Sequence, residues 1–228
     1  MGSGRLAIFA GLVAGLFGAI LCSCSGHAPE LVSVEYRLSL RPLDPNAKRV
    51  REQLAVSAAV KDEDGFKDLA ALHVLHDGSE YAWTLSPDNW TKKEQNKETW
   101  ISGVGLSTPD SDRIPRGLYR VVLEDLSGDS DETSFTLPSG LEVGASFPIV
   151  RLEGDRVSVS SNYAHTELLF LGQTEELLRV VEAPRNAIPL STLFGSPDWK
   201  GEVREILAYA YDPQRNIGIY SWIQTIRP

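Results

Sequence analysis

The sequence predicts a mainly β protein, built as two consecutive β-sandwich domains that follow an N-terminal signal segment. Apolar residues recur at every second position over many short stretches, which is the period of half-buried strands. Turn-forming clusters separate these stretches at intervals of about 8–12 residues, as in all-β sandwiches. Clean helical periodicity is missing from the first half, and 228 residues suffice for two domains of about 100 residues each.

The N-terminal segment has the features of a signal peptide. Arg5 precedes the uncharged, apolar residues 6–21, a stretch that is short for a membrane span of about 20 residues. The following Leu21-Cys22-Ser23-Cys24 resembles a bacterial lipobox, with an aliphatic residue at −3 and a small residue at −1. We therefore expect cleavage between Ser23 and Cys24 and attachment of diacylglycerol to Cys24. An uncleaved signal anchor and an ordinary secretory peptide are the alternatives.

This segment predicts the location and the domain organisation. Acyl chains on Cys24 would hold the protein to a membrane of the bacterial cell envelope. Cys22 is a poor acceptor, because Leu21 at its −1 position is too bulky for cleavage. No other Cys exists, so an intramolecular disulfide in the mature body is excluded. The expected divisions are a signal peptide at 1–23, a lipidated Cys and tether at 24–30, a sandwich at 31–138 and a second β-rich domain at 139–228.

Strands are predicted in order along the first half. They are expected at 31–40, 54–60, 72–76, 80–85, 100–106, 118–125 and 134–137. Asp77-Gly78 predicts a hairpin with a type I′ turn. The polar residues 86–99, with Trp90 among them, are expected to form a long loop. Pro138, Ser139 and Gly140 are poor strand formers and are expected to link the two halves.

The second half is also predicted to be β-rich. Hairpins are expected around Glu153-Gly154-Asp155 and around residues 212–216, which separate the apolar stretches 205–211 and 217–226. Short apolar strands are expected at 167–171 and 177–181. Residues 174–179 could instead form one helical turn, and 188–194 are ambiguous.

Residues 72–137 resemble a set of uncharacterised spirochaete lipoproteins that carry an Ig-like or fibronectin-type-III-like domain. The features that carry the resemblance are Tyr81-Ala82-Trp83-Thr84-Leu85, Asn89-Trp90, Glu98-Thr99-Trp100-Ile101, the stretch 114–121 and Phe135-Thr136-Leu137. The resemblance covers about a third of the chain. It implies a sandwich fold and an envelope location, but no catalytic or ligand residues.

Charge and motifs exclude several classes of function. A formal net charge of −9 disfavours nucleic-acid binding. No Gly-x-Ser-x-Gly, His-Glu-x-x-His or phosphate-binding glycine loop is present, and the set His165, Glu167 and Ser160 is a weak hydrolytic candidate. His73 and His76 would point to opposite faces of a strand. The acidic turns at 62–65 and 129–132 lack EF-hand spacing, so we expect solvated turns, with no metal and no cofactor.

Trp90 and Trp100 are the candidate contact surface. Exposed aromatic rings stack on sugars or anchor protein partners, although both rings could instead cap one end of the sandwich, which is the favoured interpretation. We expect a non-enzymatic binding or scaffolding module with a protein or glycan partner. The alternatives are an accessory subunit, with an exposed apolar patch on 139–228, and an envelope hydrolase, with a deep pocket of convergent polar groups.

Overall fold

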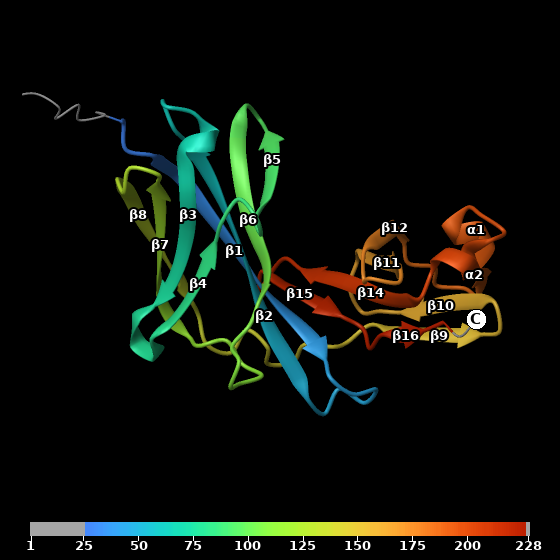
Figure 1. The fold of residues 1–228 in the computed structure, drawn as a ribbon. Coiled ribbons are helices and arrows are strands. Elements are labelled where there is room, and N and C mark those ends of the chain that lie inside the picture. The colour runs from blue at the N-terminus through green and yellow to red at the C-terminus, as the bar shows by residue number, and fades with distance from the viewer. Residues whose placement is uncertain (1–25, 227–228) are drawn as a thin grey trace, which may run out of the picture.

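The computed structural model describes residues 26–226 and confirms a mainly β protein in a sandwich-like arrangement (Figure 1). The strands are β1 Glu30–Pro42, β2 Val50–Lys61, β3 Leu69–His76, β4 Tyr81–Leu85, β5 Thr91–Gln95, β6 Glu98–Leu106, β7 Gly117–Asp125, β8 Ser130–Leu137, β9 Ile149–Glu153, β10 Arg156–Ser160, β11 Thr166–Leu171, β12 Leu177–Glu182, β13 Ile188–Pro189, β14 Glu205–Asp212, β15 Ile217–Tyr220 and β16 Gln224–Thr225. The helical elements are η1 Phe66–Asp68, η2 Asp77–Ser79, α1 Leu190–Phe194 and α2 Trp199–Glu202.

The first half is a sandwich of two sheets. One sheet has the order β1-β2-β6-β5, and the other has the order β4-β3-β7-β8. Strands of immunoglobulin constant-type domains are arranged in the same way, as A-B-E-D on one sheet and C-F-G on the other, with β4 here added beside β3. Alternate residues of each strand face inward, and they form a core that includes Leu54, Val56, Val121 and Leu123, none of which is exposed.

Tyr119 near the start of β7 fixes the corner between the two sheets. Its ring is fully buried and stacks on Phe135, with ring centroids 5.0 Å apart. Its hydroxyl donates to the backbone carbonyl of Pro115, four positions upstream, over 2.8 Å. This contact resembles the tyrosine corner of Ig-like sandwiches. The tyrosine belongs to the stretch 114–121, on which the resemblance to such domains partly rests.

Residues 86–99 differ from the expected loop. They form the strand β5, which pairs antiparallel with β6, and only a short turn at 86–90 precedes it. Asn96 and Lys97 join the two strands with φ of 54° and 68°, the positive values that a two-residue type I′ turn requires. Neither turn residue is glycine, so the hairpin gave no strong local signal. All of β5 is exposed, as suits a polar edge strand.

The second half has its own core between two layers. The strands β12-β11-β14-β15 form one layer, while β13-β10-β9 and the two helices form the other. Phe170, Ile206 and Trp199 are buried between these layers. The ambiguous residues 188–194 are the short strand β13 followed by α1, which ends at Gly195 with a φ of 82°. Residues 174–176 are a turn, and β12 starts at Leu177, so no helical turn forms there.

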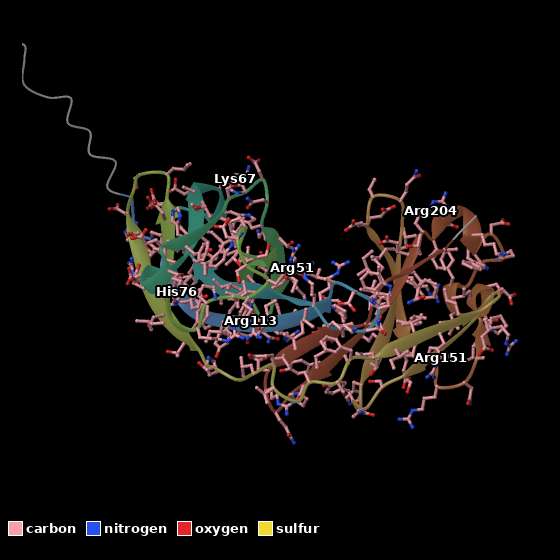
Figure 2. The ribbon with its side chains drawn as sticks, turned by 90° about the horizontal axis from the view of Figure 1, so that it is seen from below. Arg51, Lys67, His76, Arg113, Arg151 and Arg204 are labelled. Carbon is pink, nitrogen blue, oxygen red and sulfur yellow. The ribbon has the colours of Figure 1, made fainter. Side chains whose placement is uncertain are left out.

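One strand of the second half completes the sheet of the first. β15 pairs parallel with β1, which joins strands of both halves into a single nine-stranded sheet. Ile217 and Ile219 of β15 are fully buried in the first core. Beyond Pro138 the chain also contacts the first half, since Glu142 lies 3.1 Å from both Arg113, labelled in Figure 2, and Arg116. A domain boundary near residue 138 stays a prediction.

Candidate functional site

The signal segment, with Ser23 and Cys24, lies outside the described residues. The described chain starts at Gly26 and reaches β1 through His27 (Figure 1). The backbone N–H of His27 donates to Oδ2 of Asp64, and its ring lies 3.4 Å from Glu63 and 3.8 Å from Asp64. The tether therefore meets the sandwich at the end that carries the turn between β2 and β3. No helix within residues 26–226 is long and apolar enough to cross a bilayer.

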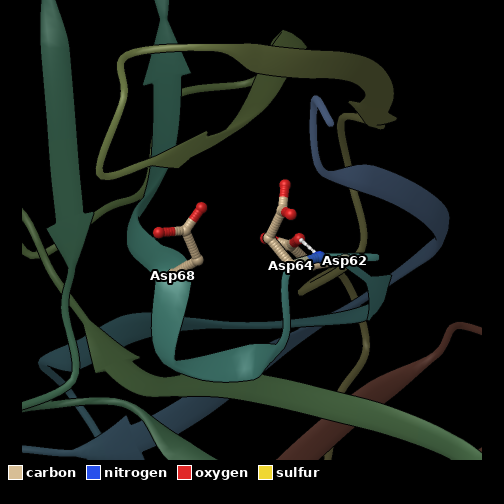
Figure 3. Close-up of side chains that lie close together, drawn as sticks. All are labelled: Asp62, Asp64 and Asp68. Atoms are coloured by element: carbon tan, nitrogen blue, oxygen red, sulfur yellow. Dashed lines mark hydrogen bonds between the residues drawn. The ribbon is translucent and has the colours of Figure 1, made fainter. Parts of the chain in front are cut away.

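Three carboxylates converge at this end (Figure 3). Asp62 and Asp64 follow β2, Gly65 turns the chain with a φ of 103°, and η1 brings Asp68 back toward them. One carboxylate oxygen of each residue lies within 4.8 Å of those of the other two. The backbone N–H of Asp64 donates to Oδ1 of Asp62 over 2.8 Å. Oδ2 of Asp62 is shielded from solvent and has no hydrogen-bond partner among the described residues.

A fourth carboxylate comes from the other sheet. Asp125 ends β7, pairs in register with Leu69 of β3 and is only 1% exposed. Its Oδ1 accepts from the backbone N–H groups of Ser127 and Asp129 and from the Ser127 hydroxyl, each over 2.9 Å. Burial opposes the charge, but these hydrogen bonds outweigh it and lower the pKa of Asp125. Its second oxygen, Oδ2, is buried without a partner in the described part of the chain.

Strand alternation places Asp62 and Asp125 on the inward-facing side of their strands. Even-numbered residues of β2 face the core up to Val60, and Asp62 continues that series. Odd-numbered residues of β7 face the core up to Leu123, and Asp125 continues that series. Both residues therefore stand at inward-facing positions near the end of the first core. We refer to Asp62, Asp64, Asp68 and Asp125 as the acidic end.

The charges of the acidic end repel one another. Partial burial and the charges of Asp62, Asp125 and Asp64 raise the pKa of Asp68. Within residues 26–226, no Lys or Arg lies within ion-pair distance of any of these four carboxylates. In the same range, His27 is the one basic side chain that lies close enough, and its partner is Asp64. A pocket of about 570 Å³ opens beside them, between the tether and the β5–β6 turn, with His27, Asp62, Phe66 and Lys97 in its wall.

The two candidate contact residues lie on different sides of the sheet. Trp90 is half-buried and packs against the first core, and its ring centroid lies 5.9 Å from that of Phe66. Trp100 is also half-buried, but it alternates with the inward-facing Ile101 and so lies on the outer face of β6. The structure does not bring the two rings together into one surface.

The histidines of the first half have local partners. His73 places Nδ1 3.0 Å from the Thr84 hydroxyl, and the buried His76 places Nδ1 2.6 Å from the Ser79 hydroxyl. His165 is exposed in a turn, while Ser160 and Glu167 belong to strands of two different sheets. No hydrogen bond within the described residues joins these three side chains into a hydrolytic set.

Comparison with known proteins gives distant structural likenesses only. No protein-family model matches the chain, and no curated protein matches it. Dimeric latent PorU from Porphyromonas gingivalis is 13% identical, with a TM-score of 0.33, over 87% of this chain and 20% of that one. The BSP domain of a biofilm-associated protein is 14% identical, with a TM-score of 0.27, over 75% of this chain and 27% of that one. This chain thus spans a small part of either protein, and these likenesses carry no functional argument.

Proposed function

We propose that this chain is a lipid-anchored envelope lipoprotein whose β-rich body acts as a non-enzymatic binding or scaffolding module. The observation that carries the proposal is the Leu21-Cys22-Ser23-Cys24 sequence, which ends two residues before the described body begins. The tether from Cys24 is short and is hydrogen-bonded through His27 to Asp64. A body held this close to a lipid bilayer is suited to presenting a surface at a membrane rather than to diffusing after a substrate.

Metabolic labelling with palmitate tests the anchor. Cys24→Ala should abolish the label and leave an unprocessed precursor, because no other thiol stands behind a small residue at −1. Cys22→Ala is the matched control and should still be labelled and cleaved. Label that survives Cys24→Ala and disappears with Cys22→Ala would overturn the assignment.

A second candidate function is that of an accessory subunit in an envelope protein complex. It is favoured by β12, an edge strand of the nine-stranded sheet. Three of its apolar side chains are exposed, namely Leu177 at 56%, Leu178 at 37% and Val180 at 41%. An edge with free backbone groups and apolar side chains is a template for pairing with another chain.

Site-specific cross-linking in intact cells tests this second candidate. A photo-cross-linker at Leu178 should give one discrete adduct, and Val180→Lys should remove it by placing a charge in the interface. The same cross-linker at the exposed Asp110 of the first half is the control. No discrete adduct from β12, or one that Val180→Lys leaves intact, would argue against the accessory role.

A further inference from the structure

A polar pocket of about 540 Å³ opens on the outer face of the small sheet β13-β10-β9. Val157 and Val159 of β10 are buried, so strand alternation turns Ser158 and Ser160 to the opposite face. Arg151 of β9, labelled in Figure 2, pairs in register with Ser158 and shares that face. One wall of the pocket is therefore built from adjacent positions of two paired strands.

Two further segments complete the wall of this pocket. After β12 the chain returns to β10, where the backbone N–H of Val159 donates to the carbonyl of Pro184 over 2.7 Å. The next residue is Arg185, which lines the pocket. The turn after β10 supplies Tyr163, whose hydroxyl accepts the backbone N–H of Ser146 over 3.1 Å. Three separate parts of the chain thus surround one space.

The charge of this pocket is opposite to that of the whole chain. The chain has 31 Asp and Glu residues against 22 Lys and Arg, yet the charged side chains that line the pocket in the described structure are Arg151 and Arg185 alone. Glu182 lines a smaller cavity beside it and forms no ion pair with Arg185. The arginines that form ion pairs within residues 26–226 are Arg49, Arg51, Arg113, Arg116, Arg120 and Arg215. Both guanidinium groups of the pocket therefore lack a carboxylate partner in that range.

We propose that Arg151 and Arg185 bind the phosphate group of a soluble phosphate monoester, such as a sugar phosphate. A guanidinium group presents its N–H donors in a rigid fork that matches phosphate oxygens. A phosphate monoester carries a charge of about −1.5 to −2 near neutral pH, so two guanidinium groups match it better than they match the single charge of a carboxylate. The hydroxyls of Ser158 and Ser160 and the amide of Asn162 are further donors in the wall.

The size and the place of the pocket favour a ligand from solution. A volume of about 540 Å³ lies within the range of small-molecule sites, about 300–1,000 Å³, so the pocket has room for the sugar as well as the phosphate. In Figure 1 the hairpin of β9 and β10 lies on the side of the molecule away from the tether, which disfavours a lipid headgroup of the anchoring membrane. This inference goes beyond the proposed function, and it stands whether or not Cys24 is acylated.

Calorimetric titration of the full chain in detergent with glucose 6-phosphate tests the site. We expect saturable binding that weakens as the NaCl concentration rises, because salt screens exposed charges. Two soluble probes test the choice of ligand. Glucuronate carries a carboxylate in place of the phosphate, and glycerophosphoglycerol is a phosphodiester with the headgroup chemistry of a phospholipid. Each should bind at least about tenfold more weakly, because each carries only one negative charge.

Two variants and one control localise the binding. Arg151→Gln and Arg185→Gln should each weaken the binding of glucose 6-phosphate by about tenfold or more, because each removes charge-assisted hydrogen bonds. Lys93→Gln removes one positive charge from the exposed strand β5 and should keep the full affinity. All three side chains are exposed, so an unchanged melting temperature separates lost binding from a lost fold. No binding of glucose 6-phosphate, equal binding of either other probe, or binding that both arginine variants retain would overturn the proposal.

Discussion

Glu52 and Asp125 lie at opposite ends of the same sandwich, and both are almost fully buried, at 3% and 1% exposed. Glu52 sits near the start of β2, where the guanidinium of Arg116 contacts both of its oxygens over 2.8 Å. The backbone N–H of Ile114 donates to it as well. Asp125 sits at the end of β7, and one of its oxygens has no partner in the described residues.

The same contrast extends to the neighbouring carboxylates. Beside Glu52, Arg116 also contacts Glu142, and Arg49 and Arg51 contact Asp112. We refer to this cluster as the arginine end. Burial opposes the charge of Arg116, but Glu52 and Glu142 outweigh it and raise the pKa of Arg116. At the acidic end, partial burial and the neighbouring carboxylates instead raise the pKa of Asp68. The arginine end pairs its carboxylates with guanidinium groups, whereas the acidic end has two buried carboxylate oxygens without a donor among residues 26–226.

The largest expected loss of stability comes from removing the cation at the centre of the arginine end. Arg116→Met leaves the Glu52 carboxylate buried without its cation, which typically costs about 3–5 kcal/mol of unfolding free energy. Urea unfolding measures this loss. Arg113→Met is the control, because that side chain is 71% exposed and contacts only Glu142. A loss below about 1 kcal/mol for Arg116→Met would mean that the buried pair matters little, and the contrast between the ends would fail.

The next effect concerns the scaffold of the acidic end. Phe66 lies in η1 beside Asp68, and Trp90 packs against it and against the first core. Trp90→Ala should cost about 3 kcal/mol, the lower limit for truncating a core Trp, because the ring is half-buried.

Trp100→Ala is the comparison for Trp90→Ala, since Trp100 lies on the outer face of β6. We expect it to cost about 1 kcal/mol, as for an average substitution. An unchanged melting temperature for Trp90→Ala would show that this ring faces outward, and residues around it would then become the first place to search for a protein or glycan partner.

The strands of the first half could be predicted because their signal is local. Alternation in β1, β2 and β7 specifies which residues face the core, and the same alternation places Asp62 and Asp125 at inward positions. What alternation cannot specify is which strand ends meet. Asp68 and Asp125 become neighbours only through the pairing of β3 with β7, which the sequence does not show.

Other features escaped prediction for related reasons. β15 pairs with β1 across nearly the whole length of the chain, and a contact so distant in sequence leaves no local pattern. The hairpin of β5 and β6 turns at Asn96-Lys97 rather than at a glycine, so its polar first strand resembled a loop. The predicted lipobox at Cys24, by contrast, rests on the sequence alone and lies outside the described residues.

A smaller expected effect concerns the charge of Asp68 at the acidic end. Asp68 has a pKa raised above its ordinary value of 3.8, so its ionised form opposes folding. Asp68→Asn should therefore raise the melting temperature at neutral pH. The advantage should shrink as the pH falls through the raised pKa of Asp68 and vanish below about 3.8, where the wild-type carboxyl is protonated in both states. A destabilised Asp68→Asn would show that Asp68 is not repelled.

The smallest expected effect compares an exposed ion pair of the arginine end with the buried one. Arg49 contacts Asp112 over 2.9 Å, much as Arg116 contacts Glu52, but the Arg49 side chain is 70% exposed. Water and salt screen an exposed pair, so Arg49→Gln should move the melting temperature by no more than about 2 °C. Arg51 still contacts Asp112 in that variant, which reduces the effect further. A loss as large as that of Arg116→Met would mean that the number of ion pairs, rather than the burial of Glu52, stabilises the arginine end.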